Sequence, residues 1–150
     1  MNGTLLNKIL YTLFGGALFI IYTSPKTAEI GNIIFSPNGN LIYKNNCITP
    51  FGHLLFTVLF FISLIVIKSL YNSIVSCNIR SDFRDVVRYS ILATLVYYLV
   101  SNRELFVQVD DIFYKLFNVD TVDTNGCPTH IGTVLHTVVY LLLIFLFMSI

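Results

Sequence analysis

Charged residues are scarce in this sequence. Asp, Glu, Lys and Arg together make up 11% of its 150 residues, whereas 55% of the residues are hydrophobic. A soluble domain usually carries about 25% charged residues, because polar groups must cover its surface. The composition therefore argues against an ordinary soluble domain. The formal net charge of +1 and the lack of a run rich in Lys and Arg also argue against nucleic acid as a partner.

The sequence also lacks the residue patterns of common active sites. It contains no Gly-rich phosphate loop and no Ser/His/Asp pattern. Its three cysteines include no Cys-x-x-Cys pair, which argues against a thiol oxidoreductase. No carboxylate lies within the long apolar runs described next, although ion and proton pathways through membranes usually contain such groups. We therefore predict a protein that is not an enzyme and uses no cofactor.

What the sequence does contain is four apolar runs, at residues 5–22, 51–67, 86–100 and 132–150. A helix that spans a bilayer needs about 20 apolar residues, within a range of about 17–25. The second and fourth runs meet this requirement alone. The first and third meet it if Lys8 and Arg88 extend to the membrane interface. We predict an all-α membrane protein, a bundle of four transmembrane helices; for the third run, an interfacial or re-entrant helix is the alternative.

Two of the connections between these runs have structure-forming patterns. Residues 32–35 and 41–43 are β-prone and flank an Asn-Gly turn signal, which predicts a small β-hairpin in the first loop, near residues 36–39. Residues 103–117 predict an amphipathic helix in the third loop. We expect both to contact a partner, through Ser36, Asn38 and Gly39 in the first loop and Leu105, Phe106, Val109, Ile112, Phe113, Leu116 and Phe117 in the helix. The helix could instead lie flat on the membrane or only cover its own bundle.

An internal repeat is the most specific signal in the sequence. Residues 45–58 and 125–138 match at a separation of 80 residues, and the matches include Asn, Cys, Thr and Gly, which apolar bias does not explain. Lys8 and Arg88 also differ by 80. We predict two tandem two-helix repeats, 1–75 and 76–150, related by an axis along the membrane normal. In each repeat a Thr would cap the second helix and a Gly would let a neighbouring helix approach (Thr49 and Gly52, Thr129 and Gly132).

The cations suggest an orientation for the bundle. With four spans, both termini and the loop at residues 72–85 share one side, which collects Lys8, Lys68, Arg80, Arg84 and Arg88. The positive-inside rule then favours a cytoplasmic location for both termini.

On this topology Cys47 and Cys127 share the opposite, non-cytoplasmic side, and we predict a disulfide between them. Two buried, reduced thiols are the alternative. His53, His130 and His136 lie near the same membrane end, so the five residues are also weak candidates for a zinc site. Against a metal, a single His at a helix start is more often a hydrogen-bonded interfacial residue.

The segment Gly-Cys-Pro-Thr at residues 126–129, with Gly132, His136 and a long apolar final helix, resembles part of the small multi-span membrane proteins of large nucleocytoplasmic DNA viruses. This resemblance covers mainly the last quarter of the chain. It implies a structural protein of the virion's internal membrane, or a minor capsid protein that anchors the shell to that membrane. The partners expected from it are membrane lipid and other membrane or capsid proteins of a large assembly.

Three functions therefore stand at this point. The first is a structural anchor of such an assembly, the second is an accessory subunit of a membrane enzyme complex, and the third is a small channel or transporter. The sequence also leaves a homo-oligomer open.

Overall fold

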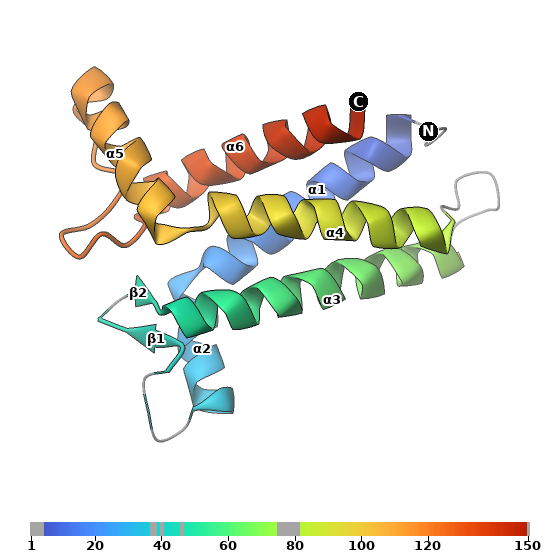
Figure 1. The fold of residues 1–150 in the computed structure, drawn as a ribbon, viewed down its shortest axis with the longest axis horizontal. Helices are drawn as coiled ribbons and strands as arrows, with labels where there is room; N and C mark the ends of the chain where they lie inside the picture. Colours follow the sequence, from blue (N-terminus) through green and yellow to red (C-terminus); the bar gives the residue numbers. More distant parts are fainter. Residues whose placement is uncertain (1–4, 37–38, 40, 46, 75–81, 150) are drawn as a thin grey trace.

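The protein is seen here in a computed structural model, which describes residues 5–36, 39, 41–45, 47–74 and 82–149. Four long helices run along the long axis of the molecule (Figure 1): α1 (Leu5–Thr23), α3 (Pro50–Ile74), α4 (Phe83–Val100) and α6 (His130–Ser149). Helix α1 begins, α3 ends, α4 begins and α6 ends at the same end of this bundle, which we call the termini end. The opposite end is the loop end.

Three of the four helices, α1, α3 and α6, are long and apolar enough to cross a membrane. Three of the four predicted spans are therefore confirmed as helices with the length and composition of a span. Helix α4 covers the third apolar run and is 18 residues long, but its first six residues include Arg84, Asp85 and Arg88. These charged residues distinguish the composition of α4 from that of the other three helices.

The loop end contains two short helices and a small hairpin. Helix α2 (Pro25–Phe35) extends from the bundle in one direction and α5 (Arg103–Phe117) in another (Figure 1). The hairpin pairs β1 (Tyr43–Lys44) with β2 (Cys47–Ile48). Helix α5 has the predicted bounds. The hairpin lies in the predicted loop but at the wrong residues, because residues 32–35 belong to α2: Pro25 at the first helical position and the apolar spacing of Ile30, Ile33 and Ile34 favour a helix.

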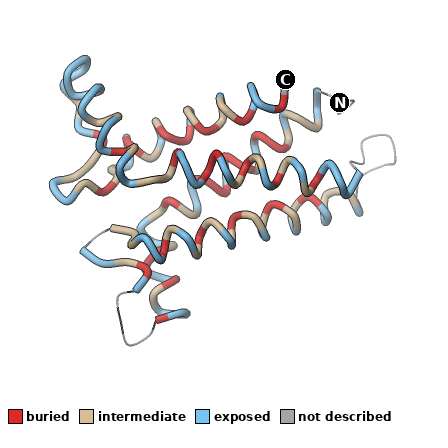
Figure 2. The backbone as a smooth tube through the Cα atoms, in the orientation of Figure 1, coloured by how far each residue is buried: buried red, intermediate tan, exposed pale blue. Residues whose placement is uncertain are grey.

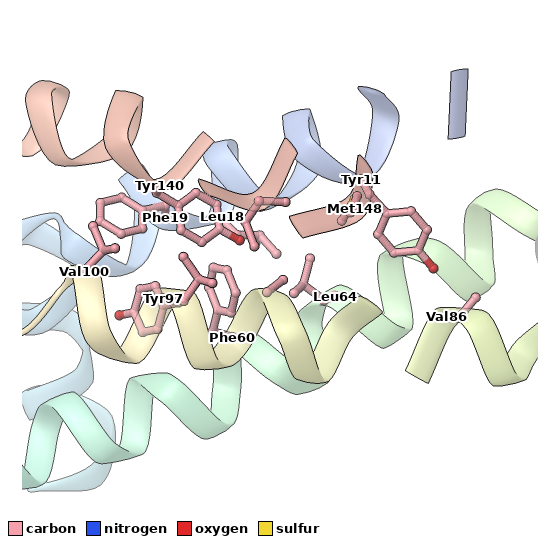
Figure 3. Packing of buried hydrophobic residues seen from close by; sticks show 13 residues of the cluster. Tyr11, Leu18, Phe19, Phe60, Leu64, Val86, Tyr97, Val100, Tyr140 and Met148 are labelled. Atoms are coloured by element: carbon pink, nitrogen blue, oxygen red, sulfur yellow. The ribbon is translucent and has the colours of Figure 1, made fainter. Parts of the chain in front are cut away.

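An aromatic layer forms the centre of the bundle (Figure 3). Each of the four long helices contributes one ring, and none of these side chains is more than 1% exposed: Phe19, Phe60, Tyr97 and Tyr140. The centroids of Phe60 and Tyr97 are 4.3 Å apart, and those of Phe19 and Tyr140 are 5.0 Å apart. Close ring contacts of this kind contribute about 1 kcal/mol each beyond the burial of their area. The layer therefore ties all four helices together at one level.

The outward faces of the bundle are also apolar. On α3, Leu54, Val58, Ile62 and Val66 form an outer ridge, and each of these side chains is 49–57% exposed. Figure 2 shows the corresponding alternation of buried and exposed positions along the helices. Apolar faces of this size are unfavourable in water, whereas lipid tails cover them at no cost. The outside of the bundle therefore matches a membrane environment.

Candidate functional site at the loop end

Helices α3 and α6 begin with the same local structure. The hydroxyl oxygen of Thr49 accepts a hydrogen bond from the amide of Gly52 at 3.1 Å, and Thr129 does the same for Gly132 at 3.2 Å. Both threonines are therefore helix caps, as the sequence predicted. The backbone amide of each threonine also donates a hydrogen bond to the preceding loop: Thr49 donates to the carbonyl of Ile42, and Thr129 to that of Thr121.

The two glycines have a different role from the predicted one. A Cβ atom on Gly52 would overlap the carbonyl oxygen of Ile42, and one on Gly132 would overlap the carbonyl oxygen of Thr121. The close neighbour is therefore the backbone of the preceding loop and not another helix. Both glycines let the loop fold directly onto the first turn of the helix.

A polar side chain from each short helix holds the following loop. Asn32 of α2 accepts from the amides of Ile42 and Tyr43 at 2.9 and 3.1 Å. Asp110 of α5 accepts from the amide and the hydroxyl of Thr121 and from the amide of Val122. Burial raises the pKa of Asp110, but these hydrogen bonds stabilise the carboxylate more, and the net pKa lies below its usual value of 3.8.

Replacing Asp110 with alanine is expected to destabilise the loop at residues 119–129 by about 2 kcal/mol, because the buried Thr121 loses its acceptor. Asp110→Asn keeps the acceptor oxygen, as Asn32 does in the first loop, and should retain most of the protection. Hydrogen exchange of the loop amides measures the effect. Equal exchange in the alanine variant and the wild type would contradict the assignment.

The same contact predicts a pH dependence. The folded-state pKa of Asp110 is depressed, so its contribution to stability is present above the unfolded pKa and is lost as the pH falls through the folded value. Loop protection in the wild type should therefore decline as the pH falls below the usual carboxyl pKa of 3.8 and through the lower folded-state pKa. Asp110→Asn cannot titrate and should not share this decline, so the difference between the two pH profiles is the measurement.

The two cysteines predicted to pair are neighbours at the loop end. Cys47 and Cys127 are placed at disulfide-bonding distance, with their Cα atoms 5.4 Å apart. Each sulfur also lies 3.9 Å from a carbonyl oxygen of the other loop, that of Asn125 for Cys47 and that of Asn45 for Cys127. The two loops therefore meet face to face at these residues.

A cavity of about 550 Å³ lies beside this cysteine pair. It is lined by the ends of α1 and α4, the start of α3 and both loops. His53 lies in its wall, stacks on Tyr98 with centroids 5.0 Å apart, and has its Nε2 atom 2.7 Å from the hydroxyl oxygen of Ser101. That hydroxyl donates to the carbonyl of Tyr97 at 2.6 Å. Because the backbone carbonyl already takes the hydroxyl proton, this His–Ser pair does not have the arrangement of an activated nucleophile.

Cys47, Cys127 and His53 line the same cavity, but the five weak metal candidates do not form one cluster. His53 is bonded to Ser101, and the ring of His136 stacks on Phe106 at 3.6 Å while its Nδ1 lies 2.9 Å from the carbonyl oxygen of Val100. His130 is exposed at the start of α6. Within the part of the chain that the structure describes, no group of three His, Cys, Asp or Glu side chains has the geometry to hold a metal ion.

No protein-family model, curated protein or solved structure matches this chain. Its function therefore has to be argued from its own residues.

The residues predicted to contact a partner differ in exposure: Leu105, Val109 and Phe113 are half-buried, and Gly39 is exposed. Ile112, Leu116 and Phe117 of α5 are 57–68% exposed, so they are accessible. Phe106 is 1% exposed beneath His136, and Ser36 is buried and donates its hydroxyl to the carbonyl of Gly39, so these two are internal. Asn38 lies outside the described residues.

A second apolar surface, which was not predicted from the sequence, lies on α2. Ile30, Ile33, Ile34 and Phe35 are 53–71% exposed there. The helical spacing of the isoleucines and the position of Pro25 indicate this helix, but the β-prone composition of residues 32–35 favoured a strand.

Proposed function

We propose that this chain is a structural membrane protein that crosses the bilayer four times and presents a rigid, cross-linked loop end to the other components of a larger assembly. One observation carries the proposal. The polar capping, loop-holding and cysteine contacts all gather at the loop end, where they fix two short helices whose apolar side chains are exposed. Rigid, exposed apolar surfaces are typical of sites that dock on a partner or a membrane.

The proposal includes α4 as the fourth span. Its outer ridge is apolar, with Ile91, Leu95 and Leu99 48–63% exposed, as on the three helices that qualify by composition. Its charged residues lie at the termini end, where long side chains can reach the headgroups. Helix α4 also contributes Tyr97 to the aromatic layer, which supports a common depth for the four helices.

The four spans would form two tandem copies of one unit, residues 1–75 and 76–150. Four pairs of matched contacts support this: Asn32 with Asp110, Ile42 with Thr121, Thr49 with Thr129, and Gly52 with Gly132. The buried positions of α3 and α6 also correspond at a separation of 80 residues, as Gly52, Phe56, Phe60, Leu64 and Lys68 against Gly132, His136, Tyr140, Ile144 and Met148. The packing of the helices is also consistent with two copies. The first helix of each copy packs on the second helix of the other, α1 on α6 and α4 on α3.

The first helices of the two copies correspond at a different separation. Thr23 is the last residue of α1, and Ser101 directly follows α4. The hydroxyl of each donates to the carbonyl four residues earlier, and the two residues are 78 apart. At that separation Lys8 corresponds to Val86, so the equal spacing of Lys8 and Arg88 is not part of the proposed repeat. The separation grows from 78 to 80 in two steps. The second copy has one more residue between Asp110 and its hairpin-like turn than the first copy has after Asn32, and it has one more residue within that turn.

On this architecture the loop end faces a non-cytoplasmic, oxidising compartment, and both termini are cytoplasmic. The support is the excess of Lys and Arg at the termini end and the cysteine pair at the loop end. The resemblance of residues 126–136 to viral membrane proteins makes a virion internal membrane, with capsid proteins as partners, the assembly that we propose to test first.

Cross-linking mass spectrometry on detergent extracts of the native source tests the function. We expect cross-links from α2 and α5 to capsid or membrane proteins of one assembly. Ile112→Ser with Leu116→Ser should weaken those from α5, whereas Glu104→Ser on the same helix should not. Recovery with respiratory subunits would replace the proposal by an accessory-subunit function. Recovery alone, with ion flux in liposomes, would replace it by a channel.

A further inference from the structure

Lys68 interrupts an otherwise apolar inner ridge. It is the last of the buried residues that recur at every fourth position of α3, and its side chain is only 1% exposed. Its ammonium nitrogen lies 4.5 Å from the centroid of the Tyr11 ring and 4.4 Å from that of the Tyr71 ring. Among the described residues, no oxygen accepts a hydrogen bond from it. The lysine therefore turns inward, into the bundle, and not outward to the membrane surface.

Two further buried polar atoms, both on α1, also lack partners. They are the hydroxyl oxygen of Tyr11 and the side-chain oxygen of Asn7, one turn apart on α1. Two aromatic faces attract a cation, by about 2 kcal/mol each when desolvated, but they do not neutralise it. A buried charge without a counter-charge costs several kcal/mol. The ammonium and the phenol can both donate, and the Asn7 amide can turn to donate as well. Together with the cation itself, the phenol and the amide on α1 therefore offer donors that fit an anionic oxygen group.

The depth of Lys68 in the membrane indicates the source of that group. Lys68 lies 18 residues after Pro50, where α3 begins, which is about 27 Å along a helix. The hydrocarbon core of a bilayer is about 30 Å thick. If the start of α3 lies at one boundary of the core, Lys68 lies close to the other, just inside the headgroup region that holds the lipid phosphates. Arg84 and Arg88 of α4 add positive charge at this end, and Asp85 in the first turn of the same helix offsets part of it.

We propose that Lys68, Tyr11 and Asn7 bind the phosphate of an anionic lipid headgroup at the termini end of the bundle. The inference rests on the proposed membrane placement but not on any partner protein. The corresponding position of α6 holds Met148, also 1% exposed. A methionine at this depth is therefore compatible with the packing, which makes Lys68→Met the matched variant. Lys68→Arg keeps the charge. Met148→Leu, at the corresponding position of α6, is the control for a change of packing alone.

Native mass spectrometry of the full chain, exchanged into micelles containing phosphatidylglycerol and phosphatidylcholine, tests the site. The wild type, Lys68→Arg and Met148→Leu should retain phosphatidylglycerol. Lys68→Met should retain at least about tenfold less, and Tyr11→Phe, which removes only the hydroxyl, about threefold less. Excess inorganic phosphate should not displace the lipid.

Several results would overturn the proposal. A wild type that carbonate extraction shows to be membrane-inserted, but that retains no more phosphatidylglycerol than Lys68→Met, would remove the site while leaving the membrane function intact. A wild type that binds radiolabelled inorganic phosphate but retains no lipid would remove the lipid source. If Lys68→Met fails to fold, Tyr11→Phe decides, because unchanged lipid retention there contradicts the assigned contact.

Discussion

Replacing Gly132 with alanine is expected to destabilise the protein by about 3 kcal/mol. Alanine normally stabilises a helix relative to glycine by about 1 kcal/mol, so the expected change in stability is opposite to the usual one. The reason is that the new Cβ atom would overlap the carbonyl oxygen of Thr121, a backbone atom that cannot rotate away. That carbonyl also accepts from the amide of Thr129, so the helix cap would have to move with it.

Thermal and denaturant unfolding in detergent measure this effect. Gly52→Ala should behave in the same way, because its Cβ atom would overlap the carbonyl oxygen of Ile42. Gly31→Ala on α2 is the matched control: its nearest neighbours are ring atoms of Phe56 at 3.2 and 3.3 Å, and a ring can shift slightly. A Gly132→Ala protein at least as stable as the wild type would show that the loop does not rest on α6.

Removing both cysteines, as Cys47→Ala with Cys127→Ala, is expected to cost about 4 kcal/mol of stability. The two residues are 80 apart, and a link across a segment of that length restricts the unfolded chain by about that amount in the loop-closure description. The pair also joins the two loops, so its loss should increase hydrogen exchange at residues 43–49 and 121–129 together. A coordinated change in two distant segments is the distinctive result.

A reductant provides an independent check on the same prediction. Adding it to the wild type should lower the unfolding midpoint to that of the double variant, and it should leave the double variant unchanged. A non-reducing peptide map should contain one peptide linking Cys47 to Cys127. Cys77→Ala tests the assignment, since it should alter neither the map nor the midpoint. A wild type that does not respond to reductant and yields no linked peptide would leave two reduced thiols in contact.

The long helices and the loop-end contacts differ in how far they could be predicted. Apolar runs located all four long helices, because a helix that must satisfy its own backbone in lipid leaves a continuous signal in the sequence. The helix caps at Thr49 and Thr129 were also predictable, since a cap depends on residues only three positions apart. The hairpin was misplaced because residues 32–35 are β-prone, while their surroundings favour α2, and local propensity is weak against such context.

The sequence by itself determined that the chain has long apolar helices, where two of them begin, and which two cysteines were expected to meet. These features depend on composition and on neighbours along the chain. Only the tertiary structure decided that Gly52 and Gly132 receive a loop and not a helix, that Asp110 holds Thr121, and that Lys68 turns into the bundle. Each of these depends on atoms from segments that come together only when the helices pack. A residue type can specify what a side chain is able to do, but packing determines which partner it meets.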